Sequence, residues 1–152
     1  MNHRSLLLAL PLVALLTACS ASPEAPQPPE IAYGQDVCDA CGMIISEARF
    51  AAAVALESGE ALIFDDAGEM FGYVSQHPEL EIRAWFVHDY TTESWLNAAE
   101  AFFVVHPSVR TPMASGVVAF ADPSAAEAFA AEHGTVVLAF QDVAASASMP
   151  MH

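Results

Sequence analysis

Residues 61–73, ALIFDDAGEMFGY, place an apolar run, a helix-capping acid and an apolar helical face in immediate succession. The run at 61–64 favours a strand. Asp66 offers an N-cap, with Glu69 three residues later as in a capping box. The apolar positions from Met70 onward follow helical spacing. This stretch therefore predicts a strand that leads directly into a helix.

The segments on either side complete a ββαβ unit. An apolar run at residues 49–56 ends in a serine-glycine pair and predicts a first strand with a hairpin turn. A histidine-proline pair at 77–78 ends the helix, because the residue before proline is driven out of the helical region. Residues 82–87 favour a strand again, since tryptophan and phenylalanine fit the pleated state.

The same order of elements recurs 56 positions later. The second unit has predicted strands at 101–105 and 116–120, a helix at 125–132 and a strand at 135–140. Three pairs of equivalent residues mark the repeat: Phe64 and Phe120, Asp66 and Asp122, and Tyr73 and Phe129. An accidental repetition is the alternative. The sequence predicts an α+β fold, in which two similar ββαβ units share one core because neither buries enough apolar surface alone.

The predicted boundaries follow from this pattern. Residues 36–90 form the first unit, and residues 91–143 form a linker and the second unit, all packed as one compact body. The tail at 144–152 is small and polar, and we expect it to be disordered. Its Met149, Met151 and His152 are expected to bind copper only weakly.

The first 35 residues are predicted to contain a targeting signal followed by a tether. A short positive region precedes an apolar run too short to span a membrane as a lone helix, which is typical of a signal peptide over residues 1–18. The junction LTAC resembles the lipobox of bacterial lipoproteins, in which Cys19 is acylated with fatty acids such as palmitate. An ordinary secretory signal is the alternative. The rest of 19–35 is a proline-rich, extended tether.

We therefore expect a lipid-anchored protein in the bacterial cell envelope that faces the periplasm, with the choice of inner or outer membrane left open. The 152-residue chain carries 19 acidic and 4 basic side chains, and none of the basic ones is lysine. This balance argues against nucleic acid as a partner and against direct adhesion to anionic lipid, because both need basic residues. The sequence has no nucleophile elbow and no phosphate-binding glycine loop, so we predict that the protein is not an enzyme.

Residues 36–43, DVCDACGM, bring three sulfur-bearing side chains into six positions. With Cys19 committed to lipid, Cys38 and Cys41 remain in an oxidising compartment. Their spacing lets both sulfurs meet at one metal ion or bond to each other. A Cu(I) site is favoured, because thiolate and thioether ligands select that ion. A redox dithiol, half of a zinc knuckle and a structural disulfide remain alternatives.

Three further residues are candidate ligands. Met43 follows Gly42, whose conformational freedom allows a turn that brings the thioether back toward the cysteines. Met113 lies in a proline- and glycine-containing turn where a thioether is exposed. His88 precedes Asp89, a carboxylate suited to orienting an imidazole on a metal. The plain alternatives are a core methionine at 43, a methionine tucked onto a sheet edge at 113, and a solvated histidine at the end of a strand.

Several short motifs span almost the whole mature domain in order. They are CDACGM at 38–43, RFAA at 49–52, FDD at 64–66, MF at 70–71, HDY at 88–90, SWLNA at 94–98, TPM at 111–113 and FAD at 120–122. Together they resemble the nitrous oxide reductase accessory lipoprotein family, NosL.

The resemblance implies a periplasmic, lipid-anchored Cu(I) carrier in denitrification. It would supply copper for the copper–sulfur centre of nitrous oxide reductase, alongside a dedicated membrane transporter complex. Cys41 and Met43 fall on the family's core motif, and Met113 falls on a family methionine, which suggests a site where the two units meet. Cys38 is replaced in some members, so its role as ligand or disulfide partner stays open. A redox or interaction lipoprotein with a Cys38–Cys41 disulfide and a carrier for a different cuproenzyme are the alternatives.

Overall fold

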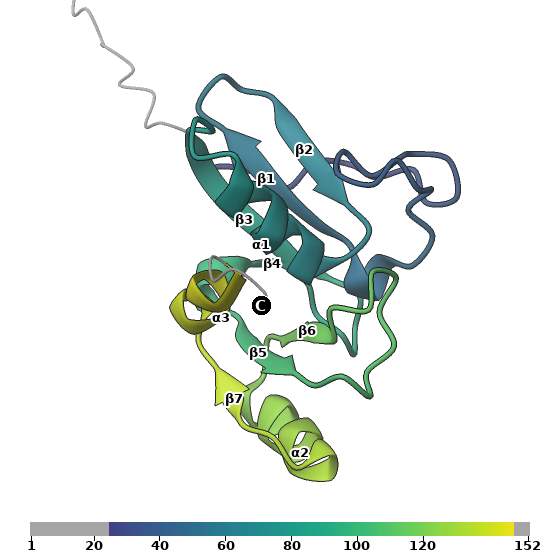
Figure 1. Cartoon of the computed structure of the whole chain (residues 1–152), viewed down its shortest axis with the longest axis vertical. Helices are drawn as coiled ribbons and strands as arrows, with labels where there is room; N and C mark the ends of the chain where they lie inside the picture. Colours follow the sequence, from purple (N-terminus) through teal and green to yellow (C-terminus); the bar gives the residue numbers. More distant parts are fainter. Residues whose placement is uncertain (1–24, 148–152) are drawn as a thin grey trace, which may run out of the picture.

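The structure, a computed structural model, describes residues 25–147 and contains two antiparallel sheets and three α-helices (Figure 1). The predicted signal peptide, Cys19 and the residues from 148 onward lie outside the described part of the chain. Within that part, no helix has the length and apolar character needed to cross a membrane.

The first unit forms a four-stranded sheet with the order β2-β1-β3-β4. Its elements, after the short 3-10 turn Ala48–Phe50, are β1 Ala52–Leu56, β2 Ala61–Phe64, α1 Ala67–Gln76, β3 Ile82–His88 and β4 Trp95–Asn97. The helix α1 begins after Asp66 and ends at His77, as the capping acid and the histidine-proline pair predict. Strand β4 was not predicted.

The second unit forms a three-stranded sheet with the order β6-β5-β7. Its elements, after the short 3-10 turn Ala98–Glu100, are β5 Phe102–Val105, β6 Val117–Phe120, α2 Pro123–His133, β7 Val137–Leu138 and α3 Phe140–Ala147. The predicted capping of α2 is present, because Asp122 accepts a hydrogen bond from the Ser124 amide and Gly134 ends the helix in the left-handed region.

The repeat is confirmed in three dimensions. In both units the first strand lies between the second and the third, and all three pair antiparallel. The ring centroids of Phe64 and Tyr73 lie 5.4 Å apart, and those of the equivalent Phe120 and Phe129 lie 5.3 Å apart. A histidine four residues later in the chain, His77 at the end of α1 and His133 in α2, stacks on this second ring. The α+β fold with two similar ββαβ units is therefore correct.

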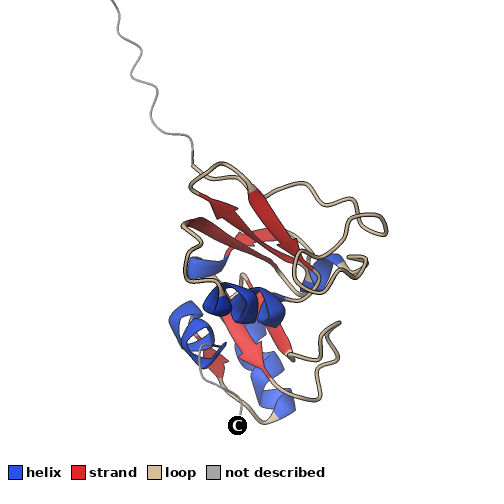
Figure 2. Ribbon diagram, turned by 45° about the horizontal axis from the view of Figure 1, so that its top comes forward, coloured by secondary structure: helices blue, strands red, loops and turns tan. Residues whose placement is uncertain are grey.

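The two units share a core. Helix α1 contacts strands of the first sheet, strand β6 of the second sheet and helix α3, so it lies between the units (Figure 2). Phe71 of α1 packs against Phe103 of β5 with ring centroids 5.8 Å apart. The buried Asp89 adds a polar link, since its carboxylate accepts a hydrogen bond from the Ala121 amide at 2.7 Å.

Two sequence expectations were wrong. The predicted strand at 135–140 is limited to Val137–Leu138, and residues 144–147 are not disordered, because they belong to α3. The physical cause is tertiary packing. Phe140 packs its ring on Trp85 and Phe71, and Val143, one helical turn later, is buried. Most residues of α3 are small, so its sequence alone does not predict a helix. The apolar face is recognisable only once α1 is seen to pack against it.

A fully buried carboxylate, Asp66, fastens the β5–β6 loop of the second unit to the start of α1. Its Oδ1 accepts hydrogen bonds from two amides in the first turn of α1 and from Ser115 Oγ at 2.5 Å. Its Oδ2 accepts from Thr111 Oγ1 at 2.6 Å and from the Met113 amide at 2.9 Å. The approach is close enough that a Cβ on Gly68 would lie 2.3 Å from the Ser115 Cβ.

We expect Asp66→Ala to lower the free energy of unfolding by about 3–5 kcal/mol, because it removes a buried network and leaves its donors unpaired. The matched control is Asp122→Ala, which removes the exposed N-cap of the equivalent helix and should cost about 1 kcal/mol. Urea unfolding of both variants checks this. Equal losses would show that Asp66 acts only as a cap.

Candidate metal-binding site

The cysteines lie in a loop that closes on itself and docks on strand β2. The Cys38 amide donates to the Met43 carbonyl at 2.8 Å, and the Gly42 amide donates to the Cys38 carbonyl at 3.0 Å. Gly42 has a φ of +73°, a conformation that side-chain-bearing residues rarely adopt. Asp39 exchanges two hydrogen bonds with the backbone of Ile63. The tight turn therefore fixes the direction in which both thiols point.

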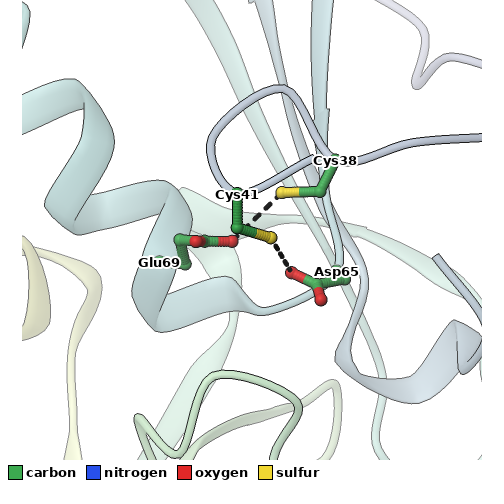
Figure 3. A group of neighbouring side chains, drawn as sticks. All are labelled: Cys38, Cys41, Asp65 and Glu69. Atoms are coloured by element: carbon green, nitrogen blue, oxygen red, sulfur yellow. Dashed lines mark hydrogen bonds between the residues drawn. The ribbon is translucent and has the colours of Figure 1, made fainter. Parts of the chain in front are cut away.

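Both thiols meet two carboxylates at the start of α1 (Figure 3). The cluster consists of Cys38, Cys41, Asp65 and Glu69, whose ligand atoms all lie within 4.8 Å of one another. Cys38 Sγ donates to Glu69 Oε2 at 3.0 Å, and Cys41 Sγ donates to Asp65 Oδ1 at 3.7 Å. Asp65 is the last residue before the N-cap, and Glu69 stands in the first helical turn. The strand-to-helix junction thus delivers both carboxylates to the thiols.

The cluster is buried on one side and open on the other. Cys38 and Asp65 are each 3% exposed, whereas Cys41 and Glu69 are half-buried. Both cysteines are free thiols in the structure. An ion bound here would touch protein on its inner side and leave an outer side accessible to another molecule.

Burial favours the protonated forms of Cys38, Cys41 and Glu69. Burial raises the pKa of Cys38 to about 12, although backbone amides such as that of Cys41 act in the opposite direction. Burial also raises the pKa of Cys41, against the lowering effects of the Met43 amide and of Cys38. Burial likewise raises the pKa of the Glu69 carboxyl. A metal ion that binds the two sulfurs must therefore displace protons from them.

Both candidate methionines are substantially exposed, Met43 at 44% and Met113 at 40%. Met43 follows the cysteine loop directly, and its amide interacts with the Cys41 sulfur. Met113 lines the same groove as Glu69 and Ala40, and its amide is bonded to Asp66, the neighbour of Asp65. The structure therefore brings a methionine of the second unit to the groove that borders the cluster in the first unit.

His88 lies outside the cluster. It is 3% exposed, its Nδ1 is 2.8 Å from the Ala51 carbonyl oxygen, and its Nε2 is 3.0 Å from the Tyr33 hydroxyl. Its ring lies against Trp95, the residue opposite it in the sheet, with centroids 3.7 Å apart. Burial lowers the pKa of His88, although the Ala51 carbonyl and Glu93 act to raise it. Both ring nitrogens already have partners within the protein.

The expected pairing of Asp89 with His88 is wrong, and so is the alternative of a solvated histidine. Neighbouring residues of a strand point to opposite faces. Asp89 accordingly turns away from His88 and accepts hydrogen bonds from the Thr91, Thr92 and Ala121 amides. Burial would raise the pKa of Asp89, but these hydrogen bonds outweigh it and lower the pKa below its usual value.

Sequence reasoning missed Asp65 and Glu69 as members of the cluster. The capping-box pattern gave Glu69 a purely structural role, and Asp65 stood out in the sequence only as part of the motif FDD at 64–66. The structure uses only the Glu69 amide for the cap and leaves its carboxylate to accept the Cys38 thiol. The available signal was the spacing of four residues, which places two carboxylates on one side of a helix start.

The fold and the cluster together define a small α+β protein with a partly open cluster of two thiols and two carboxylates that could hold a metal ion. The sequence profile of the NosL family matches residues 30–148, and the chain belongs to that family. The copper-binding lipoprotein NosL of Stutzerimonas stutzeri is 30% identical over 148 residues, which cover 90% of this chain and 78% of that protein.

The crystal structure of the copper chaperone NosL from Shewanella denitrificans shares the fold. It superposes with a TM-score of 0.69 and 22% identity, over 77% of this chain and 96% of that one. The names of both relatives describe binding and chaperone roles, and neither names a catalysed reaction.

We expect the free energy of unfolding to decrease as the pH is lowered, partly because of His88. Burial lowers its folded pKa, so below the unfolded value of about 6.5 the unfolded chain binds a proton that the folded chain resists. The free energy of unfolding should decrease between pH 7 and pH 5, and His88→Gln should show a smaller decrease, in urea titrations at several pH values. The control is His106→Gln, at a histidine bonded to the exposed Ser108. An unchanged pH slope in His88→Gln would contradict this role.

Proposed function

We propose that this protein binds Cu(I) through Cys38 and Cys41 and carries it as cargo in the cell envelope. The observation that carries the proposal is the convergence of two free thiols within 4.8 Å in a site open on one side. Thiolates select Cu(I) over hard cations. Membership of a family whose curated relative is named a copper-binding lipoprotein supports the same ion.

The carboxylates make Zn²⁺ the natural competitor, because two sulfurs and two oxygens also suit a tetrahedral zinc site. Cu(I) accepts as few as two or three soft ligands, and Met113 or Met43 supplies the third as a thioether. Asp65 and Glu69 are then not ligands of the ion. Each accepts a hydrogen bond from one of the thiols before the ion binds. The proposed ligand set is Cys38, Cys41, Met113 and Met43, with His88 left outside it.

A site with few ligands and one exposed side suits transfer by ligand exchange. A ligand of the recipient approaches from the open side, next to the half-buried Cys41, and binds the ion before the carrier's last bond breaks. No free Cu(I) is then released. Cys38 is buried on the inner side of the site, and it is the last ligand to dissociate from the ion.

The proposed recipient is the apo form of nitrous oxide reductase, for assembly of its copper–sulfur centre, with a membrane transporter complex as a further partner. Lipidation of Cys19 and the proline-rich residues that follow it hold the carrier at the membrane, facing the periplasm. The predicted tether at 19–35 is too long at its end, because Ile31 packs on the core and Tyr33 is hydrogen-bonded to His88. The motifs from 38–43 to 120–122 that resemble NosL support this recipient. A different cuproenzyme, or a redox role for a Cys38–Cys41 disulfide, are the competing proposals.

We expect the reduced protein to bind one Cu(I) tightly enough to compete with a Cu(I) chelator in an anaerobic titration. Cys41→Ser and Cys38→Ser should each weaken binding by about a hundredfold or more, and Met113→Leu by about tenfold. The matched control is Met70→Leu, which changes a fully buried core methionine and should leave affinity unchanged. Loss of all copper to the chelator, or Zn²⁺ binding that excludes Cu(I), would end the proposal.

A separate test addresses the recipient. The Cu(I)-loaded protein should restore copper content and activity to apo nitrous oxide reductase under anaerobic conditions, and the same copper loaded onto Cys41→Ser should restore much less. A small-molecule Cu(I) complex set to the same free copper concentration is the comparison. Equal recovery from that complex would show that this protein is not the donor.

A further inference from the structure

The loop that carries the thiols has one buried side and one exposed side. Val37 and Ile44 pair across it in an antiparallel bridge, and the backbone hydrogen bonds on either side of the bridge mark the type of pair whose side chains lie closest together. Neighbouring residues of an extended chain point to opposite sides. Cys38 and Ile45 accordingly point into the protein, where both are buried. Val37 and Ile44 therefore point outward.

Large apolar side chains are concentrated on this outer side. Val37 is 51% exposed and Ile44 is 56% exposed, and the exposed Met43 precedes Ile44 directly. Among residues 25–147, six large apolar side chains are exposed, and these are three of them. Single exposed apolar residues are common on proteins, but neighbouring ones that form a patch indicate a contact surface. We call the surface formed by Val37, Met43 and Ile44 the loop face.

Acidic side chains surround the loop face. Asp36, Asp39 and Glu47 lie within three positions of Val37 or Ile44, and residues 25–48 include no arginine, lysine or histidine. The carboxylates of Asp36 and Asp39 accept hydrogen bonds from backbone amides, which fix their positions. A second copy of the chain would bring these carboxylates against one another, whereas basic residues on a different protein would be attracted to them. The charges therefore favour a basic partner over self-association.

We propose that the loop face is the docking surface for the protein that receives the ion, and that this partner presents an apolar patch bordered by arginine or lysine side chains. The inference rests on the proposed function and adds the chemistry of the partner's surface. Cys41 lies in the turn of the same loop and is half-buried, so docking here brings the partner's ligands to the open side of the site. The apolar contact holds the complex together, and the opposite charges speed its formation.

The test measures the rate of copper transfer from the Cu(I)-loaded protein to apo nitrous oxide reductase, the proposed recipient. The variant Val37→Thr/Ile44→Thr removes apolar surface but keeps residues suited to extended backbone. It should transfer copper at least about fivefold more slowly. Its Cu(I) affinity and its rate of copper transfer to a small-molecule chelator should match those of the wild-type protein. The control is Val136→Thr, at a valine of the second unit that is 65% exposed, and it should transfer at the wild-type rate.

The contribution of charge is tested separately. Transfer from the wild-type protein to the reductase should slow as the salt concentration rises, because salt screens the attraction between opposite charges. Glu47→Lys should lower the rate at low salt by about threefold or more and weaken its dependence on salt. The matched control is Glu132→Lys, which makes the same change of charge at an exposed position on α2 and should have a smaller effect.

Four results would overturn the inference. They are wild-type transfer by Val37→Thr/Ile44→Thr, a transfer rate that neither salt nor Glu47→Lys changes, equally slowed transfer to the chelator, and a wild-type dimer in sedimentation that the double variant separates. Equally slowed transfer to the chelator would show that the loop face acts on the metal site itself, and the dimer would assign the face to a second copy.

The outcome also separates this inference from the proposed function. If the wild-type protein holds Cu(I) against the chelator but does not transfer it to the reductase, the inference and the proposed recipient fail, and copper binding stands. If the wild-type protein loses Cu(I) to the chelator in the equilibrium titration, the proposed function and the inference fail together.

Discussion

The buried carboxylate of Asp66 is the interaction on which the site depends. A carboxylate removed from water is tolerated only where hydrogen bonds satisfy both oxygens, and here the donors come from two units that are far apart in sequence. The bonds to the start of α1 set the position of Glu69, while the bond to the Met113 amide holds the second unit's loop. One residue outside the thiol cluster therefore determines which groups lie close to it.

The fold could be predicted where local chemistry and tertiary packing agree. The strand at 61–64 and the helix after Asp66 are bounded by a cap and by a histidine-proline pair, which act within a few residues and are visible in the sequence. Helix α3 was missed for the opposite reason. Phe140 and Val143 form an apolar face only in relation to Trp85 and α1, and nothing local distinguishes that face from a small-residue tail.

The site shows the same division. The spacing of Cys38 and Cys41 is a local signal, and the structure does bring these two thiols close together. The resemblance to NosL, and not this spacing, pointed to Met113 in the second unit's loop. The carboxylates of the cluster were not predicted as part of the site, because acidic residues near the start of a helix are usually explained by helix capping. His88 was misjudged because a histidine-aspartate pair in sequence does not stay a pair in a strand, where the two side chains point to opposite faces.

The internal repeat preserves the arrangement of strands and helix in both units but not the thiol cluster. A shift of 56 positions places Ala121 and Ala125 where the first unit has Asp65 and Glu69, and Ser94 and Asn97 where it has the two cysteines. The copies thus keep the same scaffold, including the histidine stacked on an aromatic ring, but only one has the chemical groups of the cluster. The two units are therefore alike in backbone and unlike in chemistry: the first carries the thiols and carboxylates, and the second contributes the loop that Asp66 holds beside them.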